Sequence, residues 1–177
     1  MAHDLAASVR ARLLDIAKAE QTDFNSVLVR YALERFLYRL GQSAHADHFV
    51  LKGAMLFNLW YAMPHRPTRD VDLLGFGPSD LQSIAQAFRE IVNVVAEDGI
   101  VFDAASVRVE EIRKNAGYAG ARVIVSAQCR FWRGLNGCPA TKPMLNAPST
   151  IKRCDAHFLA TQLSAIIYTC TSPSTSQ

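Results

Sequence analysis

Two aspartates stand one residue apart at the start of an apolar run, in the stretch RPTRDVDLL at residues 66–74. Successive side chains of a β-strand point to opposite faces of a sheet, so Asp70 and Asp72 would share one face, with carboxylates close enough to repel. Such a face must lie in water or hold a positive charge between the two carboxylates. The pair therefore predicts a strand with one polar face.

Hydrophobic periodicity predicts the elements around this strand. Asp23 is placed to cap a helix, and Ser79 with Gln82 forms a capping box ahead of another. Helices are predicted at residues 5–20, 23–41, 54–63 and 81–95, and strands at residues 49–53, 70–76, 99–103, 106–113 and 121–127. These elements predict an α+β fold, a small mixed sheet with helices packed on one side and a two-helix N-terminal lead-in.

The composition changes sharply near residue 128. The chain has 177 residues and is 50% hydrophobic, which suits one globular domain. After residue 128 the sequence contains five Lys or Arg but a single acid, Asp155, and it holds all four cysteines. We therefore divide the chain into a folded domain at residues 1–128 and a divergent or out-of-frame, poorly ordered tail at residues 129–177.

The N-terminus and the hydropathy profile bear on location. The first twenty residues mix acids and bases and contain no apolar core of the kind that signal peptides have. No window approaches about 18 uninterrupted apolar residues, the length that a spanning helix needs. We expect a cytoplasmic protein without a membrane partner.

The order of strand, glycine, helix and Asp-x-Asp strand suggests phosphate chemistry. Backbone N–H groups at a helix start after Gly53 favour a phosphate, and two carboxylates on one strand face suit Mg²⁺ whose remaining ligands are phosphate and water. Alternatively, the acids are solvated or paired with Arg66 and Arg69 at a strand end.

Four segments closely resemble the AbiEii/AbiGii family of nucleotidyltransferase toxins, a branch of the polymerase-β-like nucleotidyltransferases. They are RYALERFLYRL, FVLKGAMLFNLWY, PHRPTRDVDLLGFG and GIVFDAASVRVEEIR, and the resemblance covers about residues 8–127. It implies a toxin of a toxin–antitoxin system that transfers a nucleotide from an NTP to RNA, with tRNA as the best-supported class. Mg²⁺, the NTP and an antitoxin encoded nearby are the cofactor and partners that it implies.

The resemblance also implies roles for individual residues. Asp70 and Asp72 match the metal ligands, which would make them the catalytic pair, and Gly53 matches the first glycine of the nucleotide-binding turn. Lys52 and Arg69 flank these motifs and would neutralise triphosphate charge. Ala54 occupies the position where the family has Ser or Thr, so one hydroxyl donor to a phosphate is missing.

The sequence after residue 128 departs from the family. Similar proteins place a third carboxylate on a later strand, whereas here only Asp155 follows and no strand pattern leads into it. We expect the sheet to lose that strand and the site to lose its third acid. Two alternatives to an active toxin therefore stay open: a catalytically impaired remnant that at most binds nucleotide or antitoxin, and a helical DNA-binding module.

Two further groups of side chains contain potential metal ligands. Cys129, Cys138, Cys154 and His157 do not have the spacing of a zinc knuckle or ribbon, and His45, His48 and His65 fit loop histidines near helix ends.

Overall fold

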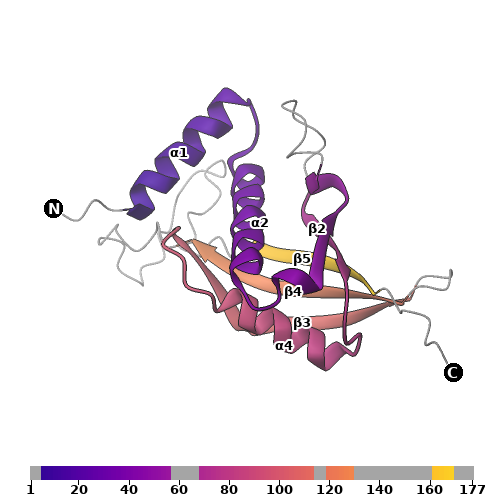
Figure 1. Ribbon diagram of the computed structural model, residues 1–177. Coiled ribbons are helices and arrows are strands. Elements are labelled where there is room, and N and C mark those ends of the chain that lie inside the picture. The colour runs from indigo at the N-terminus through magenta and orange to yellow at the C-terminus, as the bar shows by residue number, and fades with distance from the viewer. Residues whose placement is uncertain (1–4, 57–67, 114–118, 130–160, 170–177) are drawn as a thin grey trace, which may run out of the picture.

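The computed structural model describes residues 5–56, 68–113, 119–129 and 161–169, which form a mixed α+β domain (Figure 1). This confirms the predicted fold class. The helices are α1 (Leu5–Ala19), α2 (Phe24–Gln42), the 3-10 turn η1 (Ala46–His48) and α4 (Leu81–Val92). The strands are β1 (Phe49–Lys52), β2 (Asp70–Gly75), β3 (Ile100–Arg113), β4 (Ala119–Cys129) and β5 (Thr161–Thr169).

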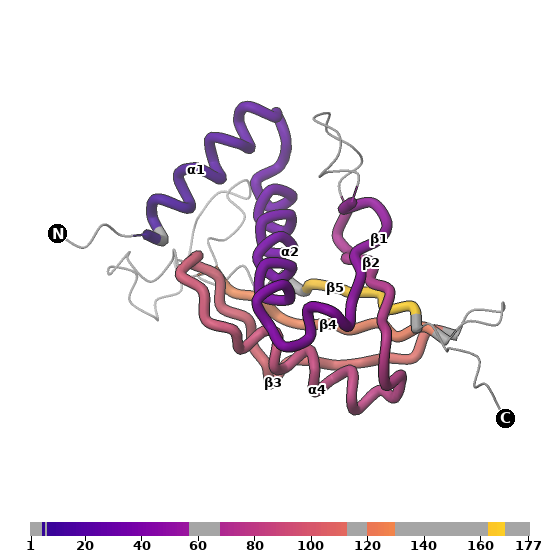
Figure 2. Tube along the Cα trace, viewed as in Figure 1, coloured from indigo at the N-terminus to yellow at the C-terminus, as the bar shows by residue number. Residues whose placement is uncertain are grey.

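The five strands form one sheet in the order β1-β2-β5-β4-β3, with β1 and β3 at its edges (Figure 2). Only β2 and β5 run parallel; the other neighbouring pairs are antiparallel. The two strands expected at residues 99–103 and 106–113 are one strand, β3, whose pairing with β4 shifts register between Asp103 and Arg108.

The prediction that the tail supplies no strand is wrong, because β5 lies between β2 and β4. Its burial alternates: Leu163, Ala165 and Ile167 are buried, whereas the residues between them are partly exposed. That period of two is what a strand with one covered face requires. Residues 130–160 and 170–177, with Asp155, lie outside the described residues, so the division at residue 128 and the order of the tail stay predictions.

Helices α2 and α4 cover one face of the sheet, and α1 packs on α2 (Figure 1). The core lies between these helices and the sheet, where Phe36 stacks on Phe88 with ring centroids 5.4 Å apart. Other fully buried members of the core are Leu28, Leu33, Val71, Leu73, Ile91, Val123 and Ile167. One face of the sheet is therefore buried in the hydrophobic core.

The N-cap residue predicted from the sequence is correct for α2 and wrong for α4. Asp23 caps α2 as predicted, accepting a hydrogen bond from the Ser26 backbone N–H at 3.0 Å. In α4 the cap is Asp80, whose carboxylate accepts from the Ser83 N–H at 2.8 Å, and not Ser79. A carboxylate is as good an N-cap as a hydroxyl, and it also favours the positive end of the helix.

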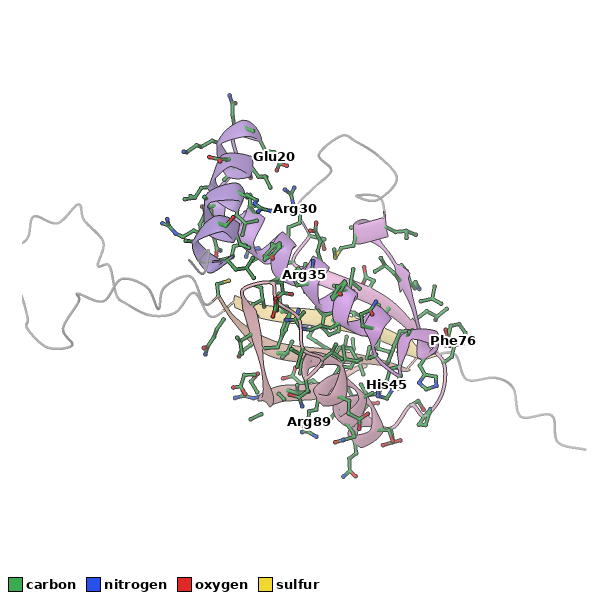
Figure 3. All side chains as sticks on the ribbon, turned by 60° about the vertical axis from the view of Figure 1, so that its left-hand side comes forward. Glu20, Arg30, Arg35, His45, Phe76 and Arg89 are labelled. Carbon is green, nitrogen blue, oxygen red and sulfur yellow. The ribbon has the colours of Figure 1, made fainter. Side chains whose placement is uncertain are left out.

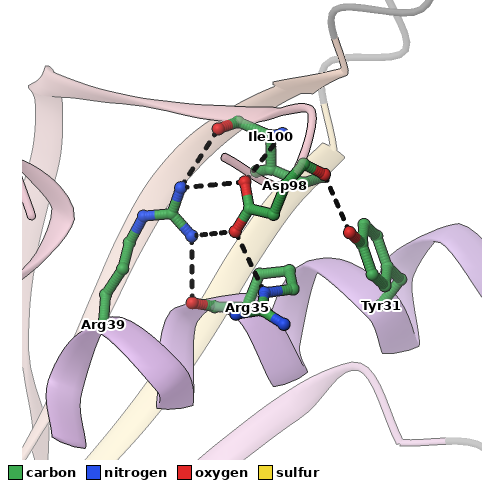
Figure 4. A network of polar contacts seen from close by, with 5 residues as sticks. All are labelled: Tyr31, Arg35, Arg39, Asp98 and Ile100. Atoms are coloured by element: carbon green, nitrogen blue, oxygen red, sulfur yellow. Dashed lines mark hydrogen bonds and ion pairs between the residues drawn. The ribbon is translucent and has the colours of Figure 1, made fainter. Parts of the chain in front are cut away.

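A buried ion pair ties α2 to the turn before β3 (Figure 4). Arg39 donates to both carboxylate oxygens of Asp98, at 2.7 and 3.1 Å, and to the Ile100 carbonyl at 3.2 Å. Arg35 donates to the same carboxylate at 3.0 Å, and the Tyr31 hydroxyl donates to the Asp98 carbonyl at 2.8 Å. This network fixes the position of α2 over the sheet.

Cys129 is buried at the end of β4, and we expect its thiol to be unreactive in the folded protein. Burial, with a smaller effect of the Asp98 charge, raises its pKa to about 12. Alkylation by iodoacetamide at pH 8 should therefore be slowed by at least about a hundredfold relative to guanidinium-unfolded protein, since the thiolate is the reactive form. Mass spectrometry of the Cys129 peptide measures this, and equal rates in the two states would contradict the burial.

None of the helices in the described part of the chain is long and apolar enough to cross a membrane.

Candidate active site

Strand β2 presents its two aspartates on the face of the sheet opposite to the one that α2 and α4 cover. Val71 and Leu73 are buried in the hydrophobic core, and the alternate residues Asp70 and Asp72 are partly exposed. The shared face predicted from their spacing is thus present in the structure. Their role as metal ligands stays a prediction.

Gly53 lies directly against Asp72. Lys52, the last residue of β1, pairs with Asp72 across the two strands, so the turn that follows passes over the carboxylate. A Cβ on Gly53 would overlap the carboxylate of Asp72 and stand 2.8 Å from its Cγ, and the φ angle of Gly53 is +73°. Only glycine combines this backbone conformation with this close approach. The chain is helical over residues 54–56, with the Leu56 N–H donating to the Gly53 carbonyl at 3.1 Å.

The other predicted site residues take up different positions. The half-buried Lys52 places its Nζ 4.4 Å from the ring centroid of Tyr168, on β5. Ala54 is exposed at the start of the helical residues, and Arg69 is exposed immediately before β2. The structure therefore brings Lys52, Gly53 and the aspartates together, and it leaves Arg69 at the rim.

Two residues near the aspartates, Thr68 and Ser164, were not predicted from the sequence. The Thr68 hydroxyl donates to the Asp70 carbonyl at 2.9 Å and accepts from the Asp70 N–H at 3.3 Å, which fixes the entry into β2. Ser164 of β5 is the register partner of Asp70. Thr68 had a signal, since a Thr two residues before a strand often bonds the backbone locally, but Ser164 was detectable only once β5 was paired.

The neighbouring strand supplies no acid. On the aspartate side of β5 stand Ser164, Ile166 and Tyr168, opposite Asp70, Asp72 and Leu74. Within the described residues, no group of three or more His, Cys, Asp or Glu is placed to hold a metal ion. Asp155 lies outside the described residues, so the expected lack of a third carboxylate stays a prediction.

The aspartate pair suits one divalent cation. Two carboxylates on one strand face give hard oxygen ligands, and Mg²⁺ commonly takes only one or two protein carboxylates beside phosphate and water oxygens. Because Gly53 has no side chain, the Asp72 carboxylate can lie against the backbone of the turn. The residues present therefore fit a single Mg²⁺ that a phosphate ligand completes.

His45 and His48 lie elsewhere, at a cavity of about 190 Å³ on the helix side of the sheet, and Phe76 also lines it. Figure 3 shows where His45 and Phe76 lie. His45 Nε2 is 2.8 Å from a carboxylate oxygen of Glu90, and this hydrogen bond lowers the pKa of Glu90. His65, Cys138, Cys154 and His157 lie outside the described residues. The cavity shares no residue with the aspartate face.

The comparisons with known proteins give one match. The family described as "Nucleotidyl transferase AbiEii toxin, Type IV TA system" matches residues 35–142. The match includes β1, Gly53 and β2, begins later than the resemblance noted in the sequence, and extends past residue 128. Neither the curated proteins nor the solved structures give a match.

Proposed function

Because the chain belongs to the AbiEii nucleotidyl transferase toxin family of type IV toxin–antitoxin systems, we propose that it transfers a nucleotide from an NTP to RNA, of the tRNA class. The observation that carries the proposal is the contact of Gly53 with Asp72 inside the matched region. A glycine turn that closes on a carboxylate of an Asp-x-Asp strand brings a phosphate-binding backbone next to a metal-binding pair.

Each residue of the site has a proposed task. Asp70 and Asp72 hold Mg²⁺, which when bound offsets the charge of the triphosphate. Gly53 lets the backbone approach the phosphates. Lys52, held over Tyr168, and Arg69 at the rim supply positive charge to the triphosphate. An RNA hydroxyl gives up its proton to solvent as its oxygen attacks the α-phosphorus, and the bond from that phosphorus to the leaving pyrophosphate breaks. Positioning and charge stabilisation are the protein's contributions to such a reaction.

The proposed partners follow from this reaction and from the family. NTP and RNA are the substrates, and an antitoxin is encoded nearby. Both substrates are cytoplasmic, so we place the protein there.

An impaired remnant is the second candidate, and one observation favours it. The strand beside β2 carries Ser164 and Ile166, and no acid, opposite the aspartates. Loss of a third carboxylate removes electrostatic stabilisation, which in phosphoryl transfer is the main source of catalysis. The remnant would bind NTP with Mg²⁺ but would not turn it over.

The DNA-binding interpretation has little support from the helices. Arg30 makes two hydrogen bonds of 3.0 Å to Glu20, and both Arg35 and Arg39 bond Asp98. Three basic side chains of α2 are therefore engaged within the protein instead of facing a phosphate backbone.

Asp70→Asn and Asp72→Asn test the proposal, and each is expected to weaken Mg²⁺-dependent NTP binding about tenfold or more, since the ligand charge sets metal affinity. Each should also abolish transfer of an α-³²P-labelled nucleotide to tRNA. Calorimetry with a non-hydrolysable NTP measures the first effect, and gel autoradiography the second. The fold should persist, because removing one carboxylate relieves repulsion.

Asp103→Asn is the matched control, because Asp103 is an exposed aspartate on β3 and should change neither readout. NTP binding by wild type without transfer would identify the remnant. If both β2 variants unfold and neither alters NTP binding, the aspartates are structural and the proposal fails.

A further inference from the structure

Ser164 occupies the position on β5 that lies beside Asp70. The two residues are partners in the parallel pairing of β2 and β5, so their Cα atoms are separated by one strand spacing, roughly 4.8 Å. Ser164 is partly exposed between the buried Leu163 and Ala165, which places its side chain on the aspartate face. A hydroxyl and two carboxylates therefore share one corner of that face.

The hydroxyl of Ser164 has an unusual environment. Its Oγ is shielded from solvent and has no hydrogen-bond partner in the described structure. Buried polar side-chain atoms nearly always have a partner, and an exception commonly marks a place where a ligand or ion completes the bonding. Ser164, whose Oγ has no partner, is thus the neighbour of Asp70, one of the two residues that suit a cation.

The other two described side chains on this face of β5 offer less to a cation. Ile166, opposite Asp72, has no ligand atom, and Tyr168 lies one step further along, opposite Leu74, with its ring beneath Lys52 Nζ. Ser164 is thus the residue of β5 whose oxygen is adjacent to the aspartate pair.

We propose that the Ser164 hydroxyl is the third protein oxygen of the Asp70–Asp72 cation site. This inference rests on the proposed function. It adds to that function the total charge of the protein ligands: two carboxylates and one neutral oxygen together carry a charge of −2. A site with that charge takes a single divalent cation, and takes it more weakly than a three-carboxylate site would.

Titration of the full chain with Mn²⁺ alone, followed by the electron paramagnetic resonance of the free ion, tests the inference without using activity. Ser164→Ala should weaken Mn²⁺ binding about threefold to tenfold, because a ligand oxygen is lost. Ser164→Asp should tighten it about tenfold or more, because the ligand charge rises from −2 to −3. The stoichiometry in wild type should be one ion.

Ser126 provides the matched control. It lies on β4 two strands away from β2, and its exposure is also partial. Ser126→Ala and Ser126→Asp introduce the same chemistry more than about 10 Å from the aspartates and should leave Mn²⁺ affinity within about twofold of wild type. Circular dichroism checks that every variant is folded.

The outcomes separate this inference from the proposed function. If Asp70→Asn abolishes Mn²⁺ binding but Ser164→Ala leaves it unchanged, the cation site stands and the role of Ser164 is wrong. If Asp70→Asn has no effect, the cation site itself fails, and the inference with it. If Ser126→Asp tightens binding as much as Ser164→Asp, the gain is a general charge effect and the inference is overturned.

Discussion

Replacing Asp98 with alanine is expected to lower the free energy of unfolding by about 3–5 kcal/mol, the usual cost of removing one partner from a buried ion pair. The Arg39 side chain is 3% exposed and would lose both of its bonds to the carboxylate. The Ile100 N–H, which donates to Asp98 at 3.1 Å, would lose its acceptor as well. Urea unfolding measures the loss.

The same carboxylate makes stability depend on pH. Burial raises the pKa of Asp98, but the hydrogen bonds from Arg39 and the Ile100 N–H, with the charges of Arg39 and Arg35, outweigh burial and hold that pKa below its ordinary value. A lowered carboxylate pKa stabilises the fold above the pKa of the unfolded chain, roughly 3.9, and that contribution is lost as pH falls through the lower folded value. Wild type should therefore lose more stability than Asp98→Asn between about pH 5 and pH 2.

An exposed ion pair and a double variant provide the controls. The Arg30–Glu20 pair is about one-third exposed, so Glu20→Ala should cost less than about 1 kcal/mol. Changing both buried partners, as Arg39→Met with Asp98→Leu, should recover part of the stability, because the buried Arg39 charge is removed together with its partner. The partly exposed Arg35 and the Ile100 N–H still lose their bonds to Asp98. If Asp98→Ala costs no more than Glu20→Ala, the buried network does not hold α2 in place.

Gly53→Ala should destabilise the protein by roughly 2–3 kcal/mol and weaken Mg²⁺·NTP binding about tenfold or more. One part of the cost is the φ angle of +73°, which L-residues rarely adopt. The other part is the overlap between the new methyl group and the carboxylate of Asp72, which must move. Thermal unfolding and NTP calorimetry measure the two effects.

Variants of two other glycines serve as controls that separate the cost of backbone strain from the cost of steric overlap with Asp72. Gly77 has a φ of +126° but open space around its Cβ position, so Gly77→Ala should cost stability and leave NTP binding unchanged. Gly41 has open space and no positive φ, so Gly41→Ala should be close to neutral. In a Gly53→Ala, Asp72→Ala double variant the overlap with the carboxylate is removed, but the new methyl group still stands 2.9 Å from the Cβ of residue 72, so the backbone strain and a smaller overlap remain. If Gly53→Ala leaves NTP binding unchanged, the position of the Asp72 carboxylate does not matter to the site.

Much of the local structure could be predicted from the sequence alone. The three-to-four residue spacing of apolar side chains gave α1, α2 and α4, the Asp23 cap was correct, and the alternation around Val71 placed Asp70 and Asp72 on one face. The family, too, was recognisable from short motifs, and its match confirms it. All these features depend on residues that lie within a few positions of one another in the chain. A sequence pattern can therefore predict them.

The tertiary structure decided which strands pair and what therefore surrounds the aspartates. The alternating apolar side chains of residues 161–169 are compatible with a strand but do not say that it inserts between β2 and β4, beside Asp70. Lys52 meets Asp72, and Gly53 closes over it, only because β1 pairs antiparallel with β2. Pairing between distant segments is set by burial and register over the whole sheet, and a parallel pair in particular needs a long crossover that local patterns cannot specify. The sequence determined the two carboxylates and their common face, and the fold determined that a serine, not an acid, stands next to them.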